Sequence, residues 1–311
     1  MSALAPLVVI LGPTASGKSS LAIWLAERLN GEVLVCDSTQ VYKYFDIGTA
    51  KVPLSEQHGI AHHLVDLCEP EQIFTAGEYR RRALQVLEEV TQHKKLPVLT
   101  AGTGLYLRAL LEGLSDAPER SEELRTRLRE KAERQGPEHL HRILTRLDSA
   151  SASRIAPRDT QKVIRAIEMR ILAKKLVGEI HGEERHRLEG YFVKKLGLSP
   201  PREALYARIE GRTESMIRDG WLDEVSRLMS KGIASDAKPF QFIGYSELRS
   251  HLNGQVTMEA AVQKIRQATR QFAKRQLTWF RKEPVVHWLA GFGDEPKIAA
   301  AALEFLRSSH P

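Results

Sequence analysis

The octapeptide Gly12-Pro13-Thr14-Ala15-Ser16-Gly17-Lys18-Ser19 constrains this chain more than any other segment. It fits the pattern G-x-x-x-x-G-K-[ST] and lies between a short apolar run, 7–11, and a helical pattern, 19–29. Its glycines permit a tight turn in which backbone N–H groups and the N-terminus of the following helix attract phosphate oxygens. Lys18 can bridge terminal phosphates, and the Ser19 hydroxyl can ligate Mg²⁺. The sequence therefore predicts a phosphate-bearing ligand bound with Mg²⁺, whatever the phosphate is attached to.

Short strands alternate with helices along much of the chain. Apolar runs predict strands at 7–11, 32–36, 97–101, 190–198 and 285–289. Amphipathic patterns predict helices at 19–29, 75–95 (capped by Thr75), 105–111, 201–231, 244–252 and 257–282. Alternation of this kind is typical of an α/β fold with a parallel sheet covered by helices on both faces. Together with the phosphate-binding loop, it predicts a P-loop NTPase-like core.

The composition of the sequence changes after about residue 115. Residues 119–187 are dense in Glu, Arg and Lys, with helical apolar spacing and no convincing strand. A chain of 311 residues has room for about two domains, one inserted in the other. We therefore expect 1–115 to form the first part of the core, 116–190 an all-helical insertion domain, and 191–311 the second part of the core. The tail after residue 290 carries no recognisable chemistry.

Composition excludes several classes of protein. The longest apolar run is far shorter than the ~20 residues that span a bilayer, and the N-terminus has no basic segment of the secretory kind. Two cysteines, Cys36 and Cys68, cannot build a disulfide framework, and His58, His62 and His63 lack a third metal ligand. A cytoplasmic monomer without membrane contact is expected. The formal net charge of +7 permits a polyanionic partner without requiring one.

An acidic residue, Asp37, directly follows the second predicted strand, at the sheet edge where α/β folds bind ligands. It could be a general base for an attacking nucleophile, a carboxylate that helps to hold Mg²⁺, or a cap for the turn that follows. Thr39 and Gln40 add a hydroxyl and an amide that could bond the edge of a base. This combination suits a nucleoside substrate.

Taken together with further motifs, these residues resemble those of one family, the tRNA dimethylallyltransferases or bacterial isopentenyl-tRNA transferases. The phosphate-binding loop is followed, in family order, by DSTQVYK (37–43), DIGTAK (46–51), HHLVD (62–66), AGTGLY (101–106), FIGY (242–245) and ATRQFAKRQLTWFR (268–281). The motifs extend from residue 12 to about 289. Two positions depart from the usual pattern: Ala101 stands where a glycine is usual, and Thr39 where Met or Ala is usual.

The resemblance implies an activity. Members transfer a dimethylallyl group from dimethylallyl diphosphate to N6 of the adenosine 3′-adjacent to the anticodon, in tRNAs that read codons beginning with U. The loop would then hold a diphosphate that is displaced, with Mg²⁺. The resemblance implies that Asp37 is the general base, that Thr14 and Arg212 hold the diphosphate, and that Thr103 lies at the substrate entrance and contacts tRNA. Independently, Arg208 and Arg212 lie four residues apart, on one helix face, where they could bind phosphate or pair with neighbouring glutamates.

Two basic helical stretches are candidates for contact with the tRNA anticodon stem-loop. One runs from Gln161 to Lys175, and the other, from Lys264 to Lys282, contains no carboxylate. Aromatic residues in the second, such as Trp279, could stack on bases or belong to the core. By resemblance, the insertion closes on tRNA. The predicted tRNA contacts are Asp37, Ser38, Thr39, Gln40, Thr103, Gln161, Lys162, Val163, Ile164, Arg165, Phe242, Ile243, Gly244, Arg270, Lys274 and Arg275.

Two other kinds of protein share part of this pattern. A small-molecule P-loop kinase would have the same loop, sheet and arginine-bearing helix, but would consume ATP and leave the basic helix 264–282 without a role. A non-enzymatic RNA-binding protein with a nucleotide-dependent switch would not need Asp37 at the pocket. Both predict no transfer from dimethylallyl diphosphate.

Overall fold

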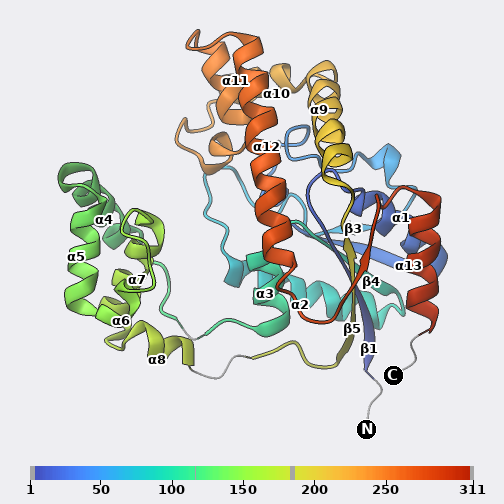
Figure 1. Ribbon diagram of the computed structural model, residues 1–311, viewed down its shortest axis with the longest axis horizontal. Helices are drawn as coiled ribbons and strands as arrows, with labels where there is room; N and C mark the ends of the chain where they lie inside the picture. The colour runs from blue at the N-terminus through green and yellow to red at the C-terminus, as the bar shows by residue number, and fades with distance from the viewer. Residues whose placement is uncertain (1–3, 116, 183–185, 309–311) are drawn as a thin grey trace. The chain divides into compact units, whose positions relative to one another are not determined.

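The computed structural model describes residues 4–115, 117–182 and 186–308 (Figure 1). The chain divides into two compact units. One comprises Met1–Leu111 together with Leu188–Pro311, and the other is Glu112–Arg187. Each unit is described by itself below.

A six-stranded parallel sheet forms the centre of the first unit. Its strands are β1 (Ala5–Leu11), β2 (Gly31–Cys36), β3 (His62–His63), β4 (Leu96–Ala101), β5 (Tyr191–Leu198) and β6 (Val286–Leu289). They lie in the order β3-β2-β4-β1-β5-β6, and Val9 of β1 is paired with Leu99 of β4 on one side and Lys195 of β5 on the other. Because all strands are parallel, the loops after β1, β2 and β4 meet at one edge of the sheet. The P-loop and Asp37 belong to that edge.

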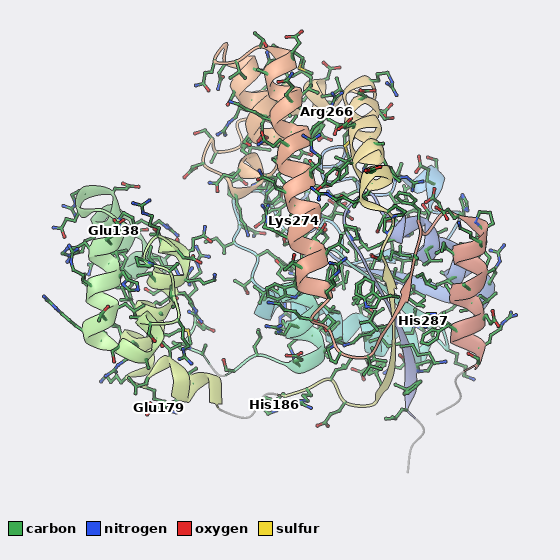
Figure 2. All side chains as sticks on the ribbon, in the orientation of Figure 1. Glu138, Glu179, His186, Arg266, Lys274 and His287 are labelled. Carbon is green, nitrogen blue, oxygen red and sulfur yellow. The ribbon has the colours of Figure 1, made fainter. Side chains whose placement is uncertain are left out.

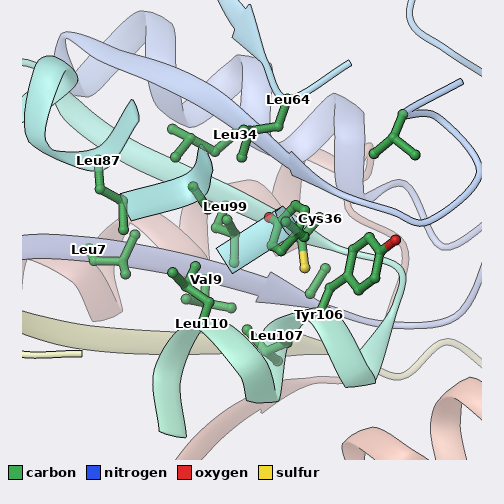
Figure 3. Close-up of a cluster of buried hydrophobic side chains, with 14 of the residues drawn as sticks. Leu7, Val9, Leu34, Cys36, Leu64, Leu87, Leu99, Tyr106, Leu107 and Leu110 are labelled. Carbon is green, nitrogen blue, oxygen red and sulfur yellow. The ribbon is translucent and has the colours of Figure 1, made fainter. Parts of the chain in front are cut away.

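Helices cover both faces of this sheet. The helices of the first unit are α1 (Lys18–Leu29), α2 (Ala76–Gln92), α3 (Gly104–Glu112), α9 (Arg202–Arg218), α10 (Trp221–Ser230), α11 (Tyr245–Leu252), α12 (Met258–Phe280) and α13 (Pro296–Ser308), with 3₁₀ turns at Leu54–Glu56 and Lys238–Gln241. One core lies between the sheet and α2 with α3, where Leu107 and Leu110 pack on Leu7 and Val9 (Figure 3). The other lies between the sheet and α1 with α13. The strands are apolar on both faces because both are buried.

The helix expected over 201–231 is interrupted. It ends as α9 at Arg218 and restarts as α10 at Trp221, because Gly220 adopts a left-handed conformation with φ of 96°. The short edge strand β3 was not predicted. It consists of two histidines paired with Val33 and Leu34, too short a segment to show an alternating pattern. Thr75 caps α2 as expected, since its hydroxyl accepts a hydrogen bond from the Glu78 amide at 3.1 Å.

A small helical cluster in the first unit packs around the loop after Asp37. Trp221 of α10 and Tyr245 of α11 are buried with Phe45 and Phe240. The Glu224 carboxylate is buried with them and accepts hydrogen bonds from the amides of Asp46 and Ile47 and from the Tyr245 hydroxyl. The loop 46–48 is thereby tied to α10 and α11. This fixes the segment that follows Ser38–Gln40.

The second unit is all-helical. Its helices are α4 (Glu122–Gln135), α5 (Pro137–Leu147), α6 (Ser149–Ala152), α7 (Thr160–Ala173) and α8 (Val177–Gly182). Its own hydrophobic core includes Leu140, Leu144, Val163 and Ile167. With the parallel sheet and its covering helices, this arrangement confirms the predicted fold class: a P-loop NTPase-like α/β core with an all-helical insertion. Among the described residues, no helix is both long and apolar enough to cross a membrane.

An ion-pair network holds this unit together, and we expect Glu168 to be its main electrostatic support. The buried carboxylate accepts hydrogen bonds from Arg125 at 2.6 and 2.8 Å and from Arg165 at 2.5 Å. Burial by itself would raise the pKa of Glu168, but the hydrogen bonds from Arg125 and Arg165 outweigh it and hold the pKa at about 2.

Glu168→Ala should destabilise the insertion by about 3 kcal/mol, because it leaves two partly buried guanidinium groups without their partner. Since the folded-state pKa is below the unfolded value, the stabilisation is present above about pH 4.5 and is lost as the pH falls toward 2. Urea unfolding at pH 7 and pH 3, compared with the exposed control Glu133→Ala, measures both effects. Equal stability of the two variants at pH 7 would show that the network contributes nothing.

Candidate active site

The P-loop connects β1 to α1 and is supported from behind by the C-terminal tail. Gly17 has a φ of 83°, and a Cβ added to it would lie 2.8 Å from the Gly293 nitrogen. The Gly293 amide also donates a hydrogen bond to the Ser16 carbonyl at 2.9 Å. Only glycine fits position 17, because both the backbone conformation and the close approach of residue 293 exclude a side chain. The tail, for which the sequence predicts no functional residue, therefore shapes the P-loop.

Lys18 lies folded over the loop. Its Nζ donates hydrogen bonds to the carbonyl oxygens of Gly12 at 2.9 Å and Pro13 at 2.8 Å. Burial lowers the pKa of Lys18 to about 8, an effect that the Asp37 carboxylate opposes and the Arg212 guanidinium reinforces. The two cations and the carboxylate are thus close enough to influence one another. Their arrangement leaves positive charge at the loop.

Asp37 is held by its own turn and lies against the residue that follows β4. Its Oδ1 accepts hydrogen bonds from the Thr39 amide at 2.8 Å and the Thr39 hydroxyl at 2.6 Å. A Cβ at Gly102 would lie 2.2 Å from Asp37 Oδ2, so the carboxylate rests directly against the backbone of the strand end. Thr39 therefore orients the carboxylate in this chain.

Thr103 joins the two strand ends. Its Oγ1 accepts a hydrogen bond from the Ser38 amide at 2.9 Å and bonds the Ser38 hydroxyl at 3.2 Å. The amides of Gly102 and Thr103 both donate to the Cys36 carbonyl, at 2.9 and 3.0 Å. Asp37, Ser38 and Thr103 consequently form one connected group.

The two arginines of α9 face different partners. Arg212 Nη1 lies 3.4 Å from Thr14 Oγ1, and burial lowers the pKa of its guanidinium while Asp37 raises it. Arg208 forms a two-pronged ion pair with Asp294 of the tail, at 2.6 and 3.0 Å. The structure thus brings Arg212 to the loop and uses Arg208 to hold the tail. Neither arginine pairs with the glutamates of α9.

Two of the glutamates of α9 are paired with α12 instead. Glu210 bonds Arg270 at 2.8 Å, and Glu214 bonds Arg266 at 2.6 Å. Figure 2 shows Arg266 and Lys274 on α12. Lys274 and Arg275 are exposed, and the structure shows no ion pair for either of them within the described residues.

Gln276, which lies within the segment 268–281, belongs to the site although its position in the sequence predicts no role for it. It is only 6% exposed, and its side chain bonds both the P-loop and the end of β4. The sequence of α12 does not single out Gln276, because a glutamine surrounded by Lys and Arg residues is usually exposed to solvent. The bonds that define it join residues 262 and 174 positions apart.

The remaining predicted tRNA contacts have mixed surroundings. Gln40 Nε2 donates to the Thr49 and Ala50 carbonyls, at 2.9 and 3.3 Å, and Phe242 packs edge-on against Tyr42. Ile243 is partly buried beside them, and Trp221 packs against Gly244, leaving no space for a Cβ there.

In the insertion, Gln161 and Lys162 are exposed. Val163 and Ile164 are buried in its core, and Arg165 bonds Glu168. Of these five side chains only Gln161 and Lys162 are exposed, and Lys162 Nζ donates to the Asp159 carboxylate at 2.6 Å.

Two aromatic residues near the end of α12, Trp279 and Phe280, differ in their exposure to solvent. Phe280 is buried in the core, whereas Trp279 is 37% exposed and lies with its indole nitrogen against Gly104. The Arg108 guanidinium lies 4.8 Å from the Trp279 ring centroid. Cys36 and Cys68 are buried free thiols.

These features define a class: an α/β protein with a P-loop, a carboxylate at the neighbouring strand end and a helical arginine directed at the loop. The comparisons agree. Residues 40–283 match the family model described as IPP transferase. Proteins named tRNA dimethylallyltransferase from Solibacter usitatus and Koribacter versatilis are each 46% identical, over 96% and 97% of this chain and 97% and 98% of their own lengths.

Solved structures give the same result. A full-length tRNA isopentenylpyrophosphate transferase from Bacillus halodurans is 35% identical, with a TM-score of 0.71 over 97% of this chain and 95% of its own. A eukaryotic dimethylallyltransferase, described as acting on tRNA, is 25% identical, with a TM-score of 0.81 over 98% of this chain and 80% of its own. The chain belongs to the IPP transferase family, the tRNA dimethylallyltransferases, and is a prenyltransferase.

Proposed function

We propose that this enzyme transfers a dimethylallyl group from dimethylallyl diphosphate to N6 of the adenosine 3′-adjacent to the anticodon, in tRNAs that read codons beginning with U. One observation carries the proposal: a basic P-loop and an oriented carboxylate, Asp37, lie together in a chain of this family. A diphosphate leaving group needs the first, and a weakly nucleophilic amine needs the second.

The loop side of the site stabilises the leaving group. As the bond between C1 of the allyl group and oxygen breaks, its electron pair stays on the diphosphate, and the developing charge is met by Lys18 and Arg212. Thr14, whose hydroxyl lies 3.4 Å from Arg212 Nη1, is the third residue proposed to hold the diphosphate. An allylic carbon tolerates the positive charge that develops on it. Fixed cations aimed at the leaving group are therefore the main catalytic contribution of the loop.

Mg²⁺ fits this side of the site. Mg²⁺ keeps several waters and is usually bound through few protein oxygens together with substrate phosphates. The Ser19 hydroxyl, at the start of α1, is the ligand that this chain offers, and no cluster of three or more His, Cys, Asp or Glu suited to a metal occurs among the described residues. A bound Mg²⁺ would neutralise diphosphate charge.

The Asp37 side activates the nucleophile. The N6 lone pair is delocalised into the purine, so the amine attacks well only as its proton is removed. In this step the bond between N6 and C1 forms, and the proton passes from N6 to the Asp37 carboxylate. The hydrogen bonds from Thr39 occupy Oδ1, which leaves Oδ2 as the atom for the proton.

The anticodon stem-loop is the partner that the remaining features suit. The target adenosine must leave its stack to reach the diphosphate. Ser38, Gln40 and Thr103 surround Asp37, and α12 supplies the exposed cations Lys274 and Arg275. In the insertion, Gln161 and Lys162 are the exposed members of the predicted tRNA-contacting segment.

Lys274→Glu combined with Arg275→Glu should weaken tRNA binding and lower its dependence on salt. Each phosphate contact contributes roughly 0.7–0.9 to the slope of log K against log salt concentration, so losing two should reduce the slope by about 1–2. Filter binding from 50 to 300 mM KCl measures it. Lys297→Glu with Arg307→Glu on α13 makes the same change in charge and should leave the slope unchanged. An unaltered slope in the first variant would exclude this part of α12 from the interface.

The identity of the donor substrate, dimethylallyl diphosphate or ATP, distinguishes the proposed transferase from a kinase. Unmodified tRNA transcript with Mg²⁺ is incubated with dimethylallyl diphosphate or with ATP, and released diphosphate and ADP are measured. We expect one diphosphate for each tRNA modified and no use of ATP. Consumption of ATP, with dimethylallyl diphosphate left intact, would make Asp37 part of a kinase site instead.

A further inference from the structure

Gln276 of α12 bonds two parts of the active site at once. Its Oε1 accepts a hydrogen bond from the Thr14 amide at 2.7 Å, and its Nε2 donates to the Gly102 carbonyl at 2.7 Å. Thr14 belongs to the P-loop, and Gly102 directly follows β4. The side chain is nearly inaccessible to solvent, so water cannot replace these bonds at low cost.

The two bonded points belong to the two functional halves of the site. The Thr14 hydroxyl lies next to Arg212, on the diphosphate side. Gly102 lies against Asp37 Oδ2, and Thr103, the next residue, holds the Ser38 amide. Gln276 is therefore a direct side-chain link between the loop that holds the leaving group and the strand end that supports the base.

Both bonds require a neutral side chain that offers one acceptor and one donor. The Thr14 N–H requires an acceptor, and the Gly102 carbonyl requires a donor. A leucine at 276 leaves both backbone groups unsatisfied. An ionised glutamate satisfies the first but repels the second, whereas a protonated glutamate can satisfy both.

We propose that Gln276 is a positioning residue for the transfer reaction. It sets the P-loop, and with it the diphosphate, at the distance from Asp37 at which the adenosine N6 can attack. This inference rests on the proposed function. A change of about 1 Å in such a distance costs rate rather than binding.

The test uses Gln276→Leu and Gln276→Glu, with Gln263→Leu and Gln263→Glu at an exposed position of the same helix as controls. We expect Gln276→Leu to lower the single-turnover transfer rate about 10- to 100-fold, with the KM for tRNA within threefold of wild type. Gln276→Glu should match this loss at pH 8.5. It should recover relative to wild type as the pH falls to 6, because the buried carboxyl then protonates and donates to Gly102.

A purely structural role predicts a different pattern. A pH-independent loss in Gln276→Glu, or a loss confined to the KM for tRNA, would overturn the proposal, as would wild-type rates in both variants. If Gln276→Leu does not fold, the pH ratio of Gln276→Glu carries the test.

A second measurement separates this inference from the proposed function. Hydrogen exchange at the Thr14 amide, followed without any substrate, should be at least tenfold faster in Gln276→Leu than in wild type, and unchanged in Gln263→Leu. Unchanged exchange in Gln276→Leu would overturn the link itself. A wild-type enzyme that transfers nothing from dimethylallyl diphosphate would overturn the proposed function and leave the exchange result standing.

Discussion

Asp37→Ala should lower the rate of dimethylallyl transfer by about 10²- to 10⁴-fold, the range that general-base catalysis contributes. The substitution removes the proposed acceptor of the N6 proton, while the P-loop, the bonds of Thr103 and the basic face of α12 remain. tRNA affinity should therefore change by no more than a few-fold. Asp37→Asn is the closer test, because an amide oxygen can still accept the Thr39 bonds but cannot take the proton.

Single-turnover rates at saturating tRNA, together with filter binding, separate the two effects. Asp236→Ala, an exposed acid before the turn Lys238–Gln241, is the matched control and should retain wild-type rates. If Asp37→Asn kept most of its activity, the base would have to be another group. If it instead lost tRNA affinity in proportion to rate, Asp37 would be a binding residue.

Lys18→Ala should lower the rate by about 10²- to 10³-fold and should also weaken binding of inorganic diphosphate. The ammonium group is the only side-chain cation of the loop itself, and its buried position concentrates its charge on the ligand. Lys18→Arg should not restore activity. The larger planar guanidinium cannot make the same two bonds to the Gly12 and Pro13 carbonyls in that space.

The pKa of Lys18 gives this prediction a pH dependence. Because burial lowers that pKa to about 8, the side chain of the free enzyme is charged below pH 8 and increasingly neutral above it. Diphosphate affinity measured by calorimetry should therefore fall as the pH rises from 7 to 9.5. Lys18→Ala should show weak affinity without this fall, and Lys297→Ala should behave as wild type. A flat wild-type profile would contradict the account.

Local patterns sufficed to predict the fold class and the P-loop. The loop has a fixed spacing between a strand and a helix, and buried parallel strands such as 97–101 are continuous apolar runs. The break at Gly220 could not be read from periodicity, since apolar residues continue in phase on both sides of it. It depends on the backbone conformation of one glycine.

The parts of the site that escaped prediction depend on contacts distant in sequence. Gln276, Gly293 and Asp294 acquire their roles only when α12 and the tail reach the P-loop. The partner of Arg208 could not be predicted from local spacing either, since it is Asp294 rather than a glutamate on the same helix. By contrast, the position of Asp37 followed directly from its place at the end of a strand.

The most direct measurement is mass spectrometry of nucleosides and nuclease fragments from an unmodified tRNA transcript, incubated with the enzyme, dimethylallyl diphosphate and Mg²⁺. The account predicts a gain of one dimethylallyl group on the adenosine 3′ to the anticodon, and no such gain with Asp37→Asn. A tRNA that gains no mass, or gains it on a nucleotide other than adenosine, would contradict it.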